Sequence, residues 1–126
     1  MHWAQTLASI LIATVVHESG HFVTARLLGV RVKRCGICWR GFYLVRESGT
    51  PLQNAVISSA GPLANLICTG SVFLIPYLGR ATITFAFFSL LLGIINLLPI
   101  PNSDGHRILA LLQNESTGHL AAEPNQ

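Results

Sequence analysis

Two histidines and one glutamate interrupt an apolar run near the start of the chain, in the stretch HESGH from His17 to His21. On a helix, residues four positions apart lie on one face, about one turn apart, so both imidazoles can ligate one metal ion. Glu18 is offset by about 100° from His17 and by about 60° from His21. This offset places its carboxylate beside the metal, where it can deprotonate a bound water molecule. The pattern therefore predicts a zinc site with a general base.

A catalytic zinc ion needs a third protein ligand and an open position for water. Asp104 is the best candidate, because the turn from Pro99 to Pro101 can carry its carboxylate back towards the histidines. His17 and His21 lie in the last third of their apolar run, and Asp104 follows the end of a later run. The topology argued below puts these two ends on the same side of a membrane, as one metal site requires.

The composition indicates which elements position these residues. Hydrophobic residues make up 51% of the 126-residue chain and charged residues 10%, whereas soluble domains carry about 25% charged residues. Three apolar runs reach the roughly 20 residues that cross a bilayer as a helix: Trp3 to Leu28, Pro51 to Leu78 and Ala81 to Ile100. A soluble bundle is the alternative, but amphipathic stripes are missing from these runs. We expect an all-α polytopic membrane protein with about three transmembrane helices.

The basic residues are distributed unevenly between these runs. Arg80 stands alone between the second and third runs, whereas five basic residues lie between the first and second, namely Arg31, Lys33, Arg34, Arg40 and Arg46. The positive-inside rule puts this basic segment, and with it the active site, on the cytoplasmic side. We therefore expect a multi-pass protein of the cell membrane. The net charge of +3 does not indicate nucleic-acid binding, and the lipid bilayer is the expected surrounding.

The segment from Val30 to Gly49 differs in character from the apolar runs. It is rich in valine, aromatic residues and glycine, with partial alternation of polar and apolar positions, which favours strands. We expect a small β-hairpin or sheet there. A short amphipathic helix should follow Asp104. We place the membrane-embedded core at residues 1–115 and a polar, disordered tail at 116–126.

Three patterns in this order resemble the site-2 protease family of zinc intramembrane metalloproteases. They are HESGH at His17–His21, GPLAN at Gly61–Asn65 and NLLPIPNSDG at Asn96–Gly105. The H-E-x-x-H pattern alone is moderately specific, and G-P-x-x-N alone is weak. The three together are highly specific and cover most of the chain from His17 to Gly105.

The resemblance implies that His17, His21 and Asp104 bind one zinc ion and that Glu18 is the general base. It also implies that Asn96 helps to bind the substrate or the developing oxyanion, and Asn65 is a further candidate for that role. The implied activity is hydrolysis of peptide bonds in membrane-spanning substrates, single-span helices that must unwind. The strand-rich segment would present an edge to the unwound substrate.

Two other functions are compatible with a metal site in a membrane. A non-catalytic zinc-binding adaptor of the same fold would keep the ligands, but it would not need Glu18 as a base. A transporter would use the histidines as transient ligands, but three spans are few for a transport path.

Overall fold

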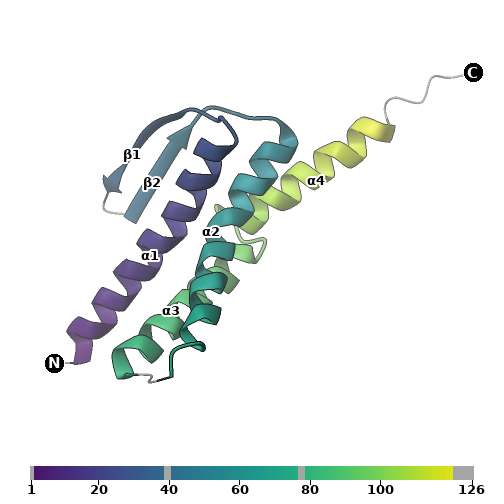
Figure 1. Ribbon diagram of the computed structural model, residues 1–126. Coiled ribbons are helices and arrows are strands. Elements are labelled where there is room, and N and C mark those ends of the chain that lie inside the picture. The colour runs from purple at the N-terminus through teal and green to yellow at the C-terminus, as the bar shows by residue number, and fades with distance from the viewer. Residues whose placement is uncertain (1, 39–40, 77–78, 121–126) are drawn as a thin grey trace, which may run out of the picture.

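The computed structural model describes residues 2–38, 41–76 and 79–120, and it contains four helices and one β-hairpin in this range (Figure 1). In chain order the elements are α1 (His2–Leu27), β1 (Val32–Cys38), β2 (Gly41–Arg46), α2 (Pro51–Val72), α3 (Arg80–Leu97) and α4 (Asp104–Leu120). This arrangement confirms the mostly helical fold class, with a small antiparallel sheet between the first and second helices.

In the described part of the chain, three helices are long and apolar enough to span a membrane, namely α1, α2 and α3. Their ends follow local chemistry. Thr50 caps α2, since its hydroxyl accepts a hydrogen bond from the Gln53 backbone while the Gln53 side chain accepts one from the Thr50 backbone. α3 ends at Leu97 because Pro99 disfavours the helical conformation at Leu98, which is extended. Both helices end before the apolar runs do, α2 at Val72 and α3 at Leu97.

The three spanning helices pack against one another, and small or polar residues line their contacts. In α1 the buried residues recur every four positions, namely Ser9, Ala13, His17, His21 and Ala25. The buried residues of α3 are Ala86, Ser89 and Gly93. Small residues at helix contacts let backbones approach closely, which is how helices associate in lipid. The bundle thus has a narrow interior into which His17 and His21 point.

The predicted hairpin is present, and β1 and β2 pair antiparallel with Gly36 opposite Tyr43. It lies beside the C-terminal half of α1 (Figure 1), and β2 is the strand nearer to that helix. One edge of β2 is paired with β1. The side chains of Tyr43, Leu44 and Arg46 on β2 line the same cavity as His17 and His21.

The helix predicted after Asp104 is longer than expected. α4 runs for 17 residues, packs against α2 and α3, and extends beyond the bundle in Figure 1. It continues through residues 116–120 of the segment for which we predicted a disordered tail, and residues 121–126 lie outside the described part. The boundary between core and tail stays a prediction.

Candidate metal centre

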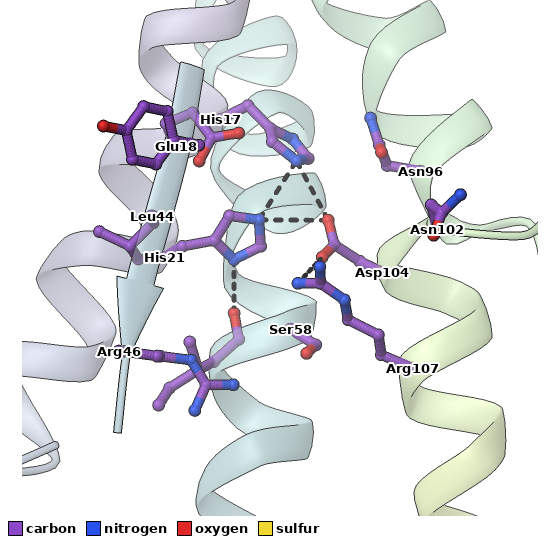
Figure 2. Close-up of a pocket in the computed structure, with 12 residues that line it drawn as sticks. His17, Glu18, His21, Leu44, Arg46, Ser58, Asn96, Asn102, Asp104 and Arg107 are labelled. Atoms are coloured by element: carbon purple, nitrogen blue, oxygen red, sulfur yellow. Dashed lines mark hydrogen bonds and ion pairs between the residues drawn. The ribbon is translucent and has the colours of Figure 1, made fainter. Parts of the chain in front are cut away.

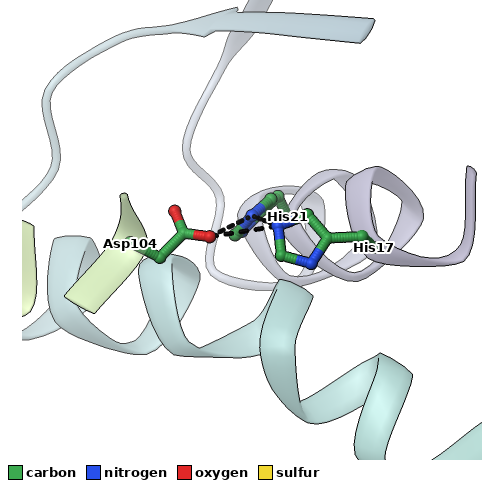
Figure 3. A group of neighbouring side chains, drawn as sticks. All are labelled: His17, His21 and Asp104. Atoms are coloured by element: carbon green, nitrogen blue, oxygen red, sulfur yellow. Dashed lines mark hydrogen bonds and ion pairs between the residues drawn. The ribbon is translucent and has the colours of Figure 1, made fainter. Parts of the chain in front are cut away.

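Three side chains from two distant parts of the chain meet inside the bundle (Figures 2 and 3). Asp104 Oδ2 lies 3.1 Å from His17 Nε2 and 3.1 Å from His21 Nε2, and the two Nε2 atoms are 3.2 Å apart. All three residues are buried. Among the described residues, this is the one group of three or more His, Cys, Asp or Glu side chains whose ligand atoms lie close enough together to hold a metal ion.

α1 places the two imidazoles on one face, one turn apart, with their rings edge to face at a centroid distance of 4.8 Å. His21 donates from Nδ1 to the carbonyl oxygen of Ile57 at 2.7 Å. A carbonyl only accepts hydrogen bonds, so the Nδ1 of His21 carries the proton. In the neutral ring Nε2 then holds a lone pair directed at the other two residues.

Asp104 reaches the histidines because the chain reverses after α3. Asn102 adopts the left-handed conformation with φ of 70°, which asparagine tolerates better than most residues. Ser103 then caps α4, since its hydroxyl accepts from the His106 backbone and donates to the carbonyl of Leu98. A side chain at Gly105 would collide with the Leu97 backbone, so glycine lets the first turn of α4 lie against the end of α3.

The surroundings of Asp104 keep its carboxylate ionised. Burial by itself would raise the pKa of this carboxyl group, but the hydrogen bonds and positive charges that the protonated forms of His17 and His21 provide outweigh burial and hold the pKa well below its usual range. Arg107, one turn along α4, places Nη1 3.9 Å from the second carboxylate oxygen. An ionised carboxylate is the form that ligates a cation.

The arrangement fits a tetrahedral zinc ion in two respects. Ligands about 2.0–2.1 Å from zinc in a tetrahedron lie about 3.3–3.4 Å from one another, close to the 3.1–3.2 Å observed. The facing residue of α2 is Gly61, and a Cβ atom there would lie 2.9 Å from His17 Nε2 and closer still to the His21 ring. Glycine thus leaves open the space on which the donor atoms converge.

A cavity of about 260 Å³ opens beside the three residues. Glu18 and Asn96 both line it, from α1 and α3, on opposite sides of the three candidate ligands in Figure 2. The amide of Asn96 donates to the carbonyl of Leu92 at 3.0 Å. Asn65 lies elsewhere: it is fully buried behind His17, with Nδ2 3.4 Å from His17 Nδ1, and is not part of the cavity lining.

Several residues that shape this site were not predicted from sequence patterns. Tyr43, Leu44 and Arg46 of β2 form one wall of the cavity, and Arg107 of α4 contributes to another. Gly61 and the carbonyl of Ile57 were also missed. The signal for Gly61 was present in GPLAN, since a glycine in a spanning helix indicates close approach. The role of Ile57 involves its backbone, which no residue type reveals.

Comparison with known proteins places the chain in a family. The sequence profile of peptidase family M50 matches residues 5–84. A protein of Synechocystis named as a zinc metalloprotease is 32% identical over 122 residues, which cover 89% of this chain and 32% of that protein.

A zinc metalloprotease of Methanocaldococcus jannaschii is 27% identical over 125 residues, covering 94% of this chain and 37% of that protein. The chain thus spans about a third of the length of these two relatives. The profile match extends over more than half of the chain and includes the HESGH and GPLAN patterns. We conclude that the chain belongs to peptidase family M50, the site-2 protease family.

Proposed function

We propose that this protein is an intramembrane zinc metalloprotease that hydrolyses peptide bonds of membrane-spanning substrates. The observation that carries the proposal is the convergence of His17 Nε2, His21 Nε2 and Asp104 Oδ2 within 3.2 Å of one another, beside a cavity that Glu18 also lines. Family membership and the names of the two relatives support the choice of zinc and of proteolysis.

Bound by these three side chains, zinc would supply Lewis acidity, which activates water and polarises the scissile carbonyl. Glu18 acts as the general base: its carboxylate accepts the proton from the attacking water and later passes it to the leaving amine. Its position next to His17 in sequence and in the lining of the same cavity supports this role.

Asn96 is the proposed hydrogen-bond donor to the substrate or the oxyanion. Its Nδ2 already donates one hydrogen to the Leu92 carbonyl, and this bond holds the amide group in place. An amide nitrogen carries two hydrogens, so one remains for the cavity. A donor fixed before the reaction stabilises developing charge without reorganisation.

The substrate that this site accepts is an extended peptide, since the amides and carbonyls of a helical segment are already paired. A two-stranded sheet leaves one edge of β2 outside the pairing, and β2 forms a wall of the cavity. An unwound segment of a single-span membrane protein can add to such an edge by main-chain hydrogen bonds.

The protein is a multi-pass membrane protein, and we place its active site on the cytoplasmic side of the cell membrane. The five basic residues between the first two spans support this orientation. Cys35 is exposed on β1 and provides a test. A membrane-impermeant thiol reagent should label Cys35 only after the cells are opened, and labelling of intact cells would reverse the orientation.

Replacement of the proposed base tests the function. Glu18→Gln keeps the size of the side chain and removes the proton acceptor, so turnover should fall by at least about 10²–10⁴-fold. Zinc should remain bound, because His17, His21 and Asp104 are unchanged. Cleavage of a membrane substrate, zinc per chain and thermal stability are measured on one preparation.

Glu47→Gln is the matched control. It makes the same chemical change at a glutamate that lies outside the cavity. Glu47 pairs with Lys33 at 3.7 Å, and an exposed ion pair contributes little to stability. Near-normal cleavage by Glu18→Gln would defeat the proposed mechanism. A wild-type protein that binds zinc but cleaves nothing would support the adaptor instead.

A further inference from the structure

The proposed function leaves no role for Asn65, although this residue has unusual surroundings. Asn65 is 0% exposed, and its Oδ1 has no hydrogen-bond partner among the described residues. Its Nδ2 faces Nδ1 of His17 at 3.4 Å. A buried polar atom without a hydrogen-bond partner destabilises the fold. We therefore look for a state of the protein in which the Oδ1 atom of Asn65 accepts a hydrogen bond.

Which ring nitrogen of His17 carries the proton decides whether Asn65 must donate or accept a hydrogen bond. Figure 3 shows one ring nitrogen of His17 directed at Asp104 and the other directed away from it. Without a metal ion, Nε2 can carry the proton and donate to Asp104 at 3.1 Å, while Nδ1 accepts from the Asn65 amide nitrogen. With a metal ion on Nε2, a neutral ring must carry its proton on Nδ1, which then faces another donor.

One turn along α1, the Nδ1–H group of His21 has the hydrogen-bond acceptor that the Nδ1–H group of His17 would need. Its Nδ1 already faces an acceptor, the carbonyl oxygen of Ile57 at 2.7 Å. Both acceptor positions come from α2, two turns apart. A backbone carbonyl can only accept a hydrogen bond, whereas an asparagine amide exchanges its acceptor and donor by a half-turn about its terminal bond.

We infer that Asn65 is a positioning residue for the metal centre. In the zinc-bound protein its Oδ1 accepts a hydrogen bond from Nδ1–H of His17, which fixes the ring in the tautomer that ligates through Nε2. A half-turn of the amide about its terminal bond brings Oδ1 to the position that faces Nδ1 of His17. This inference rests on the proposed zinc site and assigns Asn65 to the metal ligand rather than to the substrate.

The surroundings of Asn65 hold its backbone in place for this role. Its carbonyl oxygen accepts hydrogen bonds from the hydroxyl of Thr69 at 2.9 Å and from the hydroxyl of Ser89 on α3 at 3.2 Å. The side chain therefore projects from a point that is tied to two helices. A partner of a zinc-bound histidine typically raises metal affinity by 10–100-fold, and orientation of the ring depends on such support.

The test is zinc affinity, measured by competition with a chelator on the full chain in detergent. Asn65→Leu has a similar size and no polar atoms, and it should weaken zinc binding by about 10–100-fold. Asn65→Asp keeps an acceptor and should retain affinity within a few-fold. Thr69→Val, also buried on α2, removes one of the two hydrogen bonds to the Asn65 carbonyl and leaves the Asn65 side chain and the bond from Ser89 in place, so affinity should fall by no more than a few-fold.

A second measurement needs no variant. In the zinc-loaded wild type, nitrogen-15 spectra of labelled histidine should show the His17 ring protonated at Nδ1 and coordinated through Nε2. Coordination through Nδ1, unchanged affinity in Asn65→Leu, or an equal loss in Thr69→Val would each overturn the inference while leaving the proposed function intact. Absence of zinc binding by the wild type would overturn both.

Discussion

The inner and outer surfaces of the three-helix bundle have opposite compositions. Large apolar side chains such as Leu11, Ile67 and Phe87 point outward and are 59–65% exposed. The inner surface consists mainly of serine, alanine, glycine, histidine and asparagine, with Ile57 and Val72 as its larger apolar residues. In a soluble protein the large apolar residues would be inside, because water drives their burial.

The two surfaces differ in composition because the outer one faces lipid and the inner one faces the other helices. Lipid is as apolar as leucine, so packing of small residues, rather than burial of large ones, holds spanning helices together. Polar groups are costly in lipid and therefore collect in the interior, where they have partners. Changes inside should consequently affect metal binding and turnover, whereas changes outside should have little effect.

The largest effect should come from the third proposed ligand. Asp104→Ala removes one of three donor atoms, and zinc should fall from about one ion per chain to a small fraction of that, with loss of cleavage. Elemental analysis and a cleavage assay on the purified protein measure both. Full zinc content together with full activity would remove Asp104 from the ligand set.

Two glycines on α2 sharpen the comparison between the surfaces. A methyl group at Gly61 would meet both imidazoles, whereas one at Gly70 would meet nothing within 4 Å. Displacement of the histidines in Gly61→Ala should weaken zinc retention and lower cleavage by about 100-fold. Gly70→Ala should keep activity and gain up to about 1 kcal/mol of stability, because alanine favours helix. Equal activity of the two variants would show that the site tolerates a methyl group at Gly61 beside the two imidazoles.

Two isoleucines on the same helix should give the smallest effects. Ile57 packs against Ala25 and Val30 and is 1% exposed, whereas Ile67 is 65% exposed. Ile57→Ala opens a cavity and should cost about 2 kcal/mol of unfolding free energy, while Ile67→Ala should change it by less than about 0.5 kcal/mol. Unfolding in detergent would measure both, and a larger loss in Ile67→Ala would mean that a partner covers the outer surface.

Most of the secondary structure could be predicted because it depends on neighbouring residues. Runs of apolar residues predicted α1, α2 and α3, and the valine- and glycine-rich segment predicted the hairpin. Capping is equally local, since Thr50 and Gln53 are three positions apart. The end of α2 was placed too late, because hydropathy continues past Val72 into residues that are not helical.

By itself, the sequence determined that His17 and His21 share a helix face with Glu18 beside them, since a four-residue spacing has one geometry on a helix. The sequence also made Asp104 the best candidate for the third ligand, but the contact itself belongs to the tertiary structure, because His17 and Asp104 are 87 positions apart and meet only when the chain reverses after α3. The tertiary structure also decided that Gly61 faces the two imidazoles, that the Ile57 carbonyl faces His21, and that Asn65 faces His17. Such contacts depend on the relative rotation of packed helices, and in an almost uniformly apolar sequence hydropathy carries no information about that rotation.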